Sequence, residues 1–517
     1  MHSGATTLRG LFVTALDRFK SQPAVTSGGS TLSYVELVRQ ANALAHRLQH
    51  HGVGPGTPVA LMMGNGAEYV VADQAVLRAG GAKVPINDLV GQRESLHIVR
   101  DSRAVVAVAT SSQLPNALEA LADPESSVRV VIEAGADNSQ SSRPGVESWT
   151  AAVGSGALAP PEVEVAPSDV GLILYTGGTT GLPKGVVHTQ LGLTLNVLAH
   201  AVEIGFSDDE RLVLTSPLPH SSGFHLQAAQ LKGALVFVES GFDPQTVLER
   251  IERDRATFLF AVPTMIYRLL DHVEQVSVQR DPDLSSLRTI LYGAAPITAE
   301  RLTQGLTVFG SVFMQLYGQS EAPNFITRLT RDDHDPDRPE RLTSCGRPST
   351  MATVRIVDEA GAECATGSVG EVVARTAYTM EGYLGLPEKT AETLRDGWLH
   401  TGDLGRLDED GYLYLVDRKT DMIITGGMNV YSSEVENVIA ELDGVAQVAV
   451  VGLPDPDWGE AVSAFVVAGD ESDLDEAQVR DHCRERLSKY KAPKSVVFMA
   501  QLPLTSVGKL DKKALRA

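Results

Sequence analysis

Short apolar runs alternate with segments of helical spacing along the first half of the chain. Strand-like runs cover residues 58–63, 82–86 and 105–109, and the apolar residues of 68–77 recur at helical spacing. Alternating strands and helices are typical of an α/β fold with parallel sheets. The pattern therefore predicts an α/β fold for the large N-terminal part of the protein.

Further along the chain, several apolar runs end in turns built from small or polar residues. The turn after residues 170–174 is rich in glycine and threonine, and the turn at 217–224 contains His220 at a strand-to-helix junction. Two more such turns follow residues 287–292 and 312–316. Open α/β sheets bind ligands beyond the carboxyl ends of their strands, so these turns are candidates for a ligand site.

The turn from Tyr175 to Gly185 has the composition of a phosphate-binding loop. Glycines let successive backbone N–H groups point inward around an anion, while threonine hydroxyls and one lysine add donors and positive charge. The turn differs from the P-loop of kinases and GTPases, because Lys184 lies between Pro183 and Gly185. A plain surface turn is the alternative. The candidate phosphate-binding residues are Thr176, Gly177, Gly178, Thr179, Thr180, Gly181 and Lys184.

The remaining segments are predicted from composition and spacing. Residues 134–169 are rich in serine, glycine, proline and alanine, which indicates a surface connection. Residues 186–202 are predicted to form one helix. Beyond Lys419 the chain has short valine-rich strands and a charged helix at 476–487, which predicts a compact small domain at the C-terminus.

Composition and charge limit the possible partners. The chain has 517 residues, of which 43% are hydrophobic and 21% charged, as in ordinary globular proteins. Its 44 Lys and Arg against 65 Asp and Glu give a formal net charge of -21, which disfavours nucleic acid or an anionic membrane surface as the main partner. No apolar run is long enough for a membrane span. Cys345, Cys364 and Cys483 are widely spaced, which favours a reducing cytoplasm over a disulfide framework or a metal cluster.

A series of short motifs occurs in a fixed order along the chain. The motifs are the glycine- and threonine-rich turn, Tyr317-Gly318-Gln319-Ser320-Glu321, Gly346-Arg347-Pro348, Gly370-Glu371, Gly397-Trp398-Leu399-His400-Thr401-Gly402-Asp403, Asp417-Arg418-Lys419 and Gly508-Lys509. Together they resemble the adenylate-forming superfamily, which contains acyl-CoA synthetases, firefly-type luciferases and the adenylation domains of peptide synthetases. The resemblance covers nearly the whole chain and is closest to the acyl-CoA synthetases.

The resemblance implies a division into two domains. A large N-terminal domain of α/β subdomains with a β-barrel-like part would cover residues 1–417, and a small mobile α+β domain would cover 421–517. Residues 418–420 would form the hinge, with Thr420 at the pivot. In this superfamily a carboxylate first attacks the α-phosphate of ATP, and a thiol then displaces AMP from the acyl-adenylate. The small domain rotates between the two steps.

The resemblance also assigns residues to ATP and Mg²⁺. The glycine- and threonine-rich turn would hold the β- and γ-phosphates, and Glu321 would help to hold Mg²⁺. Asp403 would bind the ribose hydroxyls with help from Arg418, and Lys509 would bridge the substrate carboxylate and the α-phosphate. Lys509, Glu321 and His220 are thus the candidate catalytic residues. The residues expected around adenine are Gly293, Ala294, Ala295, Pro296, Gln315, Leu316, Tyr317, Gly318, Gln319 and Ser320.

For the second step, the resemblance favours free CoA as the acceptor, with a separate carrier protein as the alternative. Gly426 and Gly427 would leave room for the pantetheine arm, and Lys489 and Lys491 are further candidates for contact with CoA. The acyl pocket would be lined by small or apolar residues without a fixed counter-ion, which favours a hydrophobic and even bulky monocarboxylic acid over a dicarboxylate or an amino acid. Its predicted walls are His220, Ser221, Ser222, Gly223, Phe224, Gly293, Ala294 and Leu316.

Three positions depart from the pattern of the superfamily. Gly177 stands where serine is usual, Ser320 replaces a more common threonine, and Thr420 replaces an acidic residue or lysine at the hinge. One alternative is therefore a weak adenylating half, with the chain forming acyl-CoA mainly from acyl-adenylate that a partner enzyme supplies. A luciferase-like oxygenase and a non-catalytic adenylate-binding relative are further alternatives. A homodimer is also compatible with the sequence.

Overall fold

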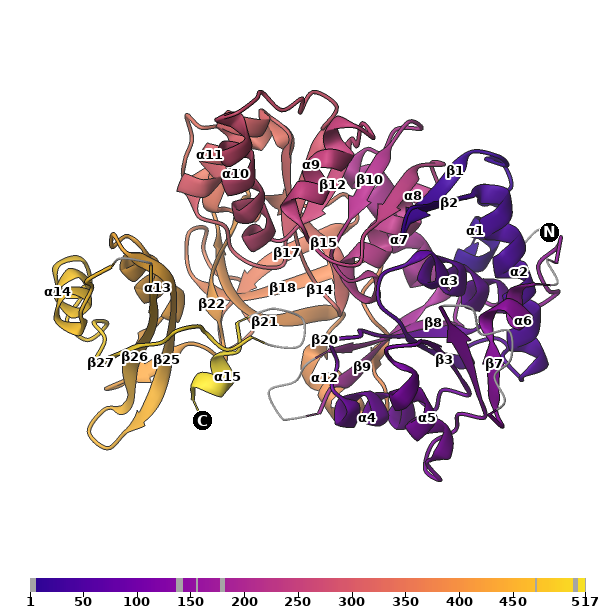
Figure 1. Cartoon of the computed structure of the whole chain (residues 1–517). Coiled ribbons are helices and arrows are strands. Elements are labelled where there is room, and N and C mark those ends of the chain that lie inside the picture. The colour runs from indigo at the N-terminus through magenta and orange to yellow at the C-terminus, as the bar shows by residue number, and fades with distance from the viewer. Residues whose placement is uncertain are drawn as a thin grey trace. The chain divides into compact units, whose positions relative to one another are not determined.

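The chain divides into two compact units. The structure is a computed structural model that describes residues 6–135, 143–154, 157–176, 182–469, 472–504 and 510–516. The larger unit comprises Met1–Thr353 and Ala374–Leu399, and the smaller unit comprises Val354–Val373 and His400–Ala517 (Figure 1). The predicted mixed α/β fold, with a large N-terminal domain and a small C-terminal domain, is thus confirmed.

The first sheet of the larger unit has eight strands in the order β19-β9-β8-β4-β3-β5-β6-β7. The strands from β8 to β7 are parallel, and β9 and β19 are added at one edge by antiparallel pairing. The bounds are β3 (Pro58–Met62), β4 (Ala82–Ile86), β5 (Val106–Thr110), β6 (Val130–Ala134), β7 (Val146–Ser148), β8 (Val170–Thr176), β9 (Lys184–Thr189) and β19 (Gly382–Tyr383).

The second sheet of the larger unit has nine strands in the order β16-β15-β14-β13-β12-β10-β11-β1-β2. Its central strands, from β14 to β1, are parallel, and both edges carry antiparallel strands. The bounds are β1 (Pro23–Ser27), β2 (Ser30–Ser33), β10 (Arg211–Leu214), β11 (Leu235–Val238), β12 (Phe258–Ala261), β13 (Thr289–Gly293), β14 (Phe313–Gln319), β15 (Ala322–Leu329) and β16 (Arg347–Pro348).

A layer of helices is shared by these two sheets. Leu61 and Leu172 of the first sheet and Leu212 and Phe260 of the second pack into one core with this layer. The outer faces of the sheets are covered by α4 and α5 and by α9, α10 and α11 (Figure 1). Because these strands are buried on both faces, they appear in the sequence as continuous apolar runs. The shared layer contains α1 (Leu8–Leu16), α2 (Tyr34–His50), α3 (Ala67–Ala79), α7 (Gln190–Ile204) and α8 (Gly223–Gln230), and the outer helices are α4 (Gln92–Ser102), α5 (Leu114–Ala122), α9 (Pro244–Glu252), α10 (Pro263–Ser277) and α11 (Ala299–Phe309).

The expected β-barrel-like part corresponds to a five-stranded sheet of β17, β18, β20, β21 and β22, and the boundary between the two units falls within β17, β18 and β21. The smaller unit has a second five-stranded sheet of its own, with a separate apolar core. The bounds are β17 (Ala352–Val357), β18 (Gly370–Thr376), α12 (Pro387–Thr393), β20 (Leu394–Arg395), β21 (Trp398–Leu407), β22 (Leu413–Arg418), β23 (Ile423–Thr425), β24 (Met428–Val430), α13 (Ser432–Ala440), β25 (Val445–Asp455), β26 (Gly459–Ala468), α14 (Glu476–Arg486), β27 (Ser495–Phe498) and α15 (Lys512–Leu515).

Two predictions about local structure were wrong. The segment 134–169 contains strand β7 and a short helix, α6 (Trp149–Val153), so it is more than a surface connection. The segment 186–202 begins as strand β9, since its valines pair with β8, and the helix starts only at Gln190, where the Thr189 hydroxyl caps it by accepting from Gly192 N. The expected turn at Tyr317–Glu321 is a hairpin whose first residues belong to β14.

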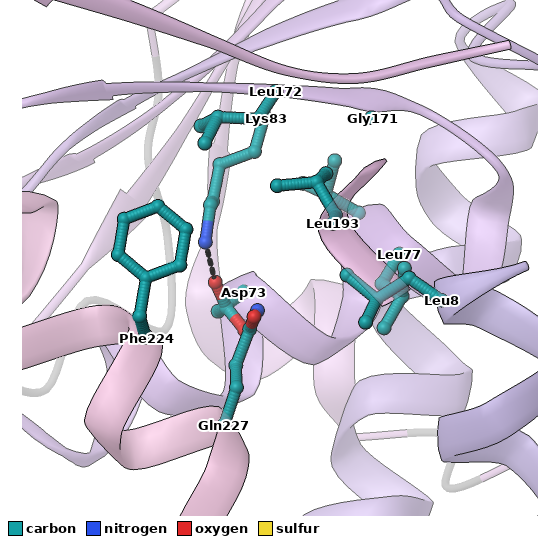
Figure 2. A pocket seen from close by; sticks show the side chains of 10 residues that line it. Leu8, Asp73, Leu77, Lys83, Gly171, Leu172, Leu193, Phe224 and Gln227 are labelled. Atoms are coloured by element: carbon teal, nitrogen blue, oxygen red, sulfur yellow. Dashed lines mark hydrogen bonds and ion pairs between the residues drawn. The ribbon is translucent and has the colours of Figure 1, made fainter. Parts of the chain in front are cut away.

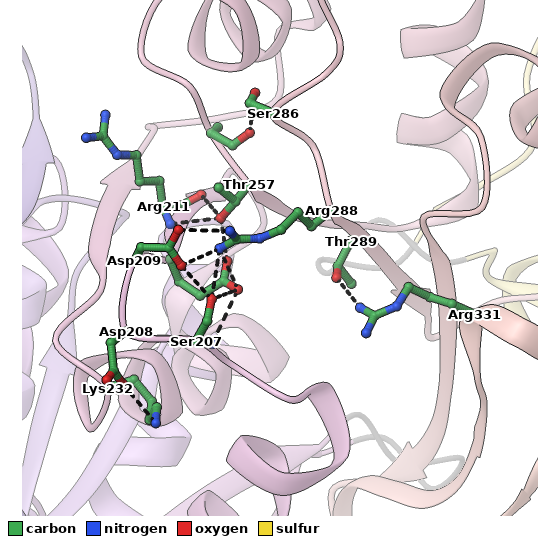
Figure 3. Close-up of polar contacts among 12 residues, drawn as sticks. Ser207, Asp208, Asp209, Arg211, Lys232, Thr257, Ser286, Arg288, Thr289 and Arg331 are labelled. Carbon is green, nitrogen blue, oxygen red and sulfur yellow. Dashed lines mark hydrogen bonds and ion pairs between the residues drawn. The ribbon is translucent and has the colours of Figure 1, made fainter.

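A polar network lies at the amino ends of the strands of the nine-stranded sheet (Figure 3). Arg288, next to β13, contacts Asp209 at 2.9 Å and Glu210 at 3.0 Å, both next to β10. Thr257, next to β12, donates a hydrogen bond to Glu210. The hydrogen bonds from Arg288 and Ser207 hold the pKa of Asp209 well below its ordinary value. The charges of this edge are therefore satisfied by one another.

The three cysteines are free. Across the described ranges, no helix is long and apolar enough to cross a membrane.

Candidate functional site

The predicted phosphate-binding turn is the loop of the β8–β9 hairpin. Thr176 and Lys184 pair with each other at its base, and both are half-buried. Gly177, Gly178, Thr179, Thr180 and Gly181 lie outside the described residues. The hairpin fixes where the loop begins and ends, because its strands are held by the antiparallel ladder of an eight-stranded sheet.

Lys184, Tyr383 and Glu321 form a cluster from three separate segments of the larger unit. Lys184 Nζ lies 4.5 Å from the centre of the Tyr383 ring, and Tyr383 donates its hydroxyl hydrogen to Glu321 Oε1 at 2.6 Å. Burial lowers the pKa of Lys184, and the carboxylate of Glu321 opposes this shift. Tyr383 thus contacts a cation with its ring and a carboxylate with its hydroxyl group. Sequence reasoning missed Tyr383; no motif that we singled out contains it.

Glu321 can contribute to a metal site but does not form one alone. Its other carboxylate oxygen accepts no hydrogen bond from the described residues. Among all residues that the structure describes, no group of three or more His, Cys, Asp or Glu side chains is suited to a metal ion. Mg²⁺ prefers several oxygen ligands and usually takes some from substrate phosphates. Glu321 therefore fits a Mg²⁺ ion that arrives with a nucleotide.

The turn between β14 and β15 is held by a buried histidine. His188 Nε2 donates to the Ser320 carbonyl oxygen at 2.8 Å. Burial lowers the pKa of His188 to about 4, so the ring is neutral at neutral pH. The backbone of Glu321 is also fixed, because its carbonyl oxygen accepts from Met380 N at 2.8 Å. The carboxylate of Glu321 is therefore presented by a rigid hairpin.

Asn324 connects this hairpin to the predicted acyl pocket. Asn324 Oδ1 accepts from the Ser221 hydroxyl at 2.8 Å, and Asn324 Nδ2 donates to His200 Nε2 at 2.8 Å. Its φ of 67° is in the left-handed region, which asparagine tolerates better than most residues. A Cβ at Gly318 would lie 2.5 Å from Asn324 N, so only glycine fits there. Asn324 and His200 were also missed by the sequence analysis, since single polar residues in apolar surroundings carry no motif.

The small residues expected at adenine follow β13. Gly293 pairs with Leu316 of β14, and a Cβ at Gly293 would lie 2.5 Å from the Leu316 carbonyl oxygen. Ala294 has a φ of 66°, and it is exposed together with Ala295 and Pro296. The structure thus brings the predicted turn next to β14, where Gln315 and Tyr317 are buried and Gly318, Gln319 and Ser320 are half-buried.

The predicted acyl pocket begins at a tight turn. Residues Leu218–Ser222 form a short turn before α8 with a kink at His220, and a Cβ at Gly223 would lie 2.4 Å from the Leu218 carbonyl oxygen. A cavity of about 10 Å³ is lined by residues that include His220, Gly223 and Phe224. Of the other predicted walls, Ser221, Ser222, Gly293, Ala294 and Leu316 do not line this cavity.

In the smaller unit, Asp403 and Arg418 are brought together as predicted. They face each other across the β21–β22 ladder, with Arg418 Nε 3.4 Å from Asp403 Oδ1. Asp403 is buried, whereas 63% of the Arg418 side chain is exposed. Thr420 is exposed in the turn that follows β22. Rotation about residues 418–420 stays a prediction.

Gly426 and Gly427 form the two-residue turn of the β23–β24 hairpin. Both have positive φ, 57° and 78°, which explains two consecutive glycines. A Cβ at Gly426 would lie 2.8 Å from the Trp458 ring, and Lys494 Nζ lies 3.5 Å from the centre of the same ring. Trp458 was therefore a missed neighbour of this turn.

The predicted lysines of the smaller unit differ in their surroundings. Lys491 Nζ contacts both oxygens of Glu434, at 2.6 and 2.7 Å, so its charge is already paired. Lys489 is exposed. Lys509 lies outside the described residues.

Comparison with known proteins agrees with the fold and these motifs, which define an adenylate-forming enzyme. The family profile "AMP-binding enzyme" matches residues 12–384, and "AMP-binding enzyme C-terminal domain" matches residues 434–509. The chain belongs to this AMP-binding enzyme family.

Relatives match over nearly the full length. A medium/long-chain-fatty-acid–CoA ligase, FadD8, of Mycobacterium tuberculosis is 36% identical, with 98% of this chain and 89% of that protein covered. A feruloyl-CoA synthase of an Amycolatopsis species is 38% identical, with 95% of each chain covered. Among solved structures, ATP-bound MatB of Rhodopseudomonas palustris has a TM-score of 0.87 at 30% identity, covering 99% of this chain and 98% of that one. The amide bond synthetase McbA of Marinactinospora thermotolerans also has a TM-score of 0.87, at 34% identity, covering 98% and 99%.

Proposed function

We propose that the chain is an AMP-forming acyl-CoA synthetase that activates a hydrophobic carboxylic acid, bulky acids included, through an acyl-adenylate. The observation that carries this proposal is the Lys184–Tyr383–Glu321 cluster beside a glycine- and threonine-rich hairpin loop. The cluster fits a nucleoside triphosphate that carries Mg²⁺. The curated relatives named above are CoA ligases that match almost the whole chain.

The first half-reaction brings together two anions, a carboxylate and the α-phosphate of ATP. Such a step needs positive charge and hydrogen-bond donors fixed where negative charge accumulates. Lys184 and the hairpin loop hold the β- and γ-phosphates, and Lys509 bridges the carboxylate and the α-phosphate. Glu321 would hold Mg²⁺, which would supply further positive charge to the phosphates when bound. Asp403 binds the ribose hydroxyls, with Arg418 beside it.

The second half-reaction needs a passage for a thiol rather than more charge. Residues 418–420 act as a hinge, so that Lys509 can leave and the Gly426–Gly427 turn can take part. Two glycines leave room for the pantetheine arm, and Trp458 offers an apolar wall beside them. The sulfur then attacks the acyl carbon and AMP leaves.

The acid is hydrophobic, because most of the predicted walls are small or apolar and none of them offers a fixed counter-ion. The relatives described above are named for fatty acids and for ferulic acid. A CoA ligase of Rhodococcus jostii that is 35% identical is named for a methyl-dioxo-octahydroindenyl propanoic acid. These acids differ in shape but share an apolar body. The three free cysteines fit a cytoplasmic enzyme.

The direct test offers the full-length protein a panel of acids with ATP, Mg²⁺ and CoA, and follows AMP, pyrophosphate and acyl-CoA by mass spectrometry. All three products are expected to form in equal amounts with hydrophobic acids. Pyrophosphate release without acyl-CoA would exclude CoA as the acceptor, and a carrier protein with its pantetheine arm is then the acceptor to add. No AMP with any acid would refute the proposal.

Synthetic acyl-adenylates, tested in parallel, separate the weak-adenylation alternative from the complete cycle. The complete cycle predicts that turnover from the free acid and ATP is comparable to turnover from the adenylate. If the protein uses only the adenylate, Gly177→Ser tests the cause. The variant should regain ATP-dependent turnover if the missing hydroxyl weakens adenylation.

A further inference from the structure

Two cavities with shared lining residues lie between the eight-stranded sheet and the shared helix layer of the larger unit. We call the cavity of about 10 Å³ that touches His220 and Gly223 the outer cavity, and the cavity of about 20 Å³ that touches Asp73 and Gln227 the inner cavity. Lys83, Leu172 and Phe224 line both cavities, and Figure 2 shows the inner one. A group that enters at His220 and passes Phe224 therefore meets the inner cavity next.

The inner cavity is lined by an ion pair and one amide side chain among otherwise apolar residues. Lys83 Nζ, from β4, contacts Asp73 Oδ1, from α3, and Gln227 Nε2, from α8, donates to Asp73 Oδ2 at 2.9 Å. Side-chain exposure is 14% for Lys83 and 2% for Asp73. The apolar walls are Leu8, Val76, Leu77, Gly171, Leu172 and Leu193.

The ammonium group of Lys83 is incompletely satisfied. It has three N–H donors, and among the described residues Asp73 is its one hydrogen-bond partner. Both oxygens of Asp73, by contrast, already accept a hydrogen bond. The unused donors of Lys83 border a space that accommodates about one oxygen atom, since a cavity needs about 10 to 15 Å³ to hold a water molecule. The site is therefore built for one small hydrogen-bond acceptor.

We propose that the Lys83–Asp73 pair selects hydrophobic acids that carry a ketone or hydroxyl oxygen remote from their carboxylate. The inference rests on the proposed function, because it assumes that the acid's tail enters beside His220. A ketone oxygen accepts from Lys83, and a hydroxyl can accept from Lys83 and also donate to Asp73. A methylene at the same place would take the space of a water and leave the other N–H donors of Lys83 without an acceptor. A second carboxylate is disfavoured, because Asp73 would repel it.

The alternative is that the Lys83–Asp73 ion pair only stabilises the packing of α3 against β4. A pair with that role alone would have no influence on which acid is bound. The two roles therefore differ in substrate preference, and stability measurements alone do not separate them.

The test uses matched acids and full-length protein. The probes are straight-chain acids of seven, nine, eleven and thirteen carbons that end in a methyl ketone, each paired with the acid in which a methylene replaces the carbonyl. Binding is measured by calorimetry with a non-hydrolysable ATP analogue and Mg²⁺ present, and adenylation is measured by pyrophosphate release. The binding measurement does not depend on turnover.

The variants are Lys83→Met, which removes the donors, and the double variant Lys83→Met with Asp73→Leu, which also removes the carboxylate that would otherwise be buried unpaired. Replacement of both partners by apolar groups of similar shape is tolerated better than removal of one. The matched control is Lys232→Met, because Lys232 pairs with Asp208 on the surface at 2.9 Å (Figure 3).

We expect the protein to bind at least one ketone acid about 10-fold or more tightly than its methylene partner. The preference should disappear in the double variant and persist in Lys232→Met. Equal binding within every pair, or a preference that survives in the folded double variant, would overturn the inference. A protein that shows the binding preference but forms neither adenylate nor acyl-CoA would refute the proposed function and leave the inference standing.

Discussion

The two edges of the nine-stranded sheet use charge in opposite ways. At the amino ends of the strands, the exposed Arg288 and Asp209 and the buried Glu210 satisfy one another (Figure 3). At the carboxyl ends, the backbone of Glu321 is fixed by a hairpin while one carboxylate oxygen accepts nothing from the described residues. Charge paired within the chain serves the fold, and charge held in place without complete pairing is available to a ligand.

The difference follows from strand polarity and from what supports each edge. Beneath the carboxyl edge, neutral buried groups such as His200 and Asn324 position the turns by directional hydrogen bonds. Those bonds fix geometry without neutralising the charged residues that they support. The comparison therefore predicts that changes at the carboxyl edge alter catalysis, whereas changes at the amino edge leave it unaltered.

The largest effect is expected from Lys509→Ala, which removes the cation that the proposed first half-reaction needs. Acyl-adenylate formation should fall by about 10²-fold or more, because the cation stabilises charge that develops when the two anions meet. Thioester formation from synthetic adenylate should be spared. Pyrophosphate release and acyl-CoA formation, measured separately, check this, with exposed Lys513→Ala as the matched control. Equal losses in both half-reactions would contradict this division of labour.

Glu321→Gln tests the carboxyl edge itself. The amide keeps the shape of the side chain but loses the negative charge, so ATP-dependent AMP formation should fall by about 10- to 100-fold. The loss should be partly recovered at raised Mg²⁺. Asp209→Asn is the control at the amino edge and should leave turnover unchanged. If both variants lose activity to the same degree, the distinction between the edges does not hold.

Gly427→Leu tests whether the uncharged turn of the smaller unit serves the thiol step. The side chain would occupy space that is open next to Gly427, so thioester formation from adenylate should fall by about 10-fold while adenylation is retained. Gly411→Leu provides the matched control, because Gly411 has a similar φ of 80° and open space in another turn of the same unit. An unaltered CoA reaction in the folded Gly427 variant would remove that residue from the thiol path.

The smallest effect concerns the neutral histidines beneath the carboxyl edge. Burial lowers the pKa of His200 to about 4, below its unfolded value of about 6.5. The unfolded chain therefore binds more protons between these values, and stability is lost as the pH falls from about 6.5 towards 4. Between pH 7.5 and 5.5, His200 should account for about 1 kcal/mol of lost stability.

Urea denaturation at the two pH values, which gives the free energy of unfolding of the larger unit, checks this prediction. His200→Gln should make the pH dependence shallower by about 1 kcal/mol, whereas exposed His50→Gln should leave it unchanged. The same slope in all three proteins would show that His200 is not the titrating group.

Sequence motifs located the site residues correctly where the backbone conformation itself requires a particular residue, such as glycine. Gly293, Gly318 and Gly223 are required because a Cβ would strike a neighbouring backbone atom, and Gly426 and Gly427 because their φ is positive. Such constraints leave a signature at single positions. Asp403 and Arg418 were also found, since both lie within motifs on neighbouring strands.

By itself, the sequence determined the parallel sheets, the two-domain composition and the turns that carry the site, because apolar runs and obligatory glycines are local properties of the chain. Only the tertiary structure decided which distant side chains meet. Tyr383 reaches Glu321 across 62 positions, and Asn324 reaches Ser221 across 103. The pairing of Lys83 with Asp73 likewise depends on how α3 packs against β4. Such contacts arise from the burial of whole helices and strands, which no single motif encodes.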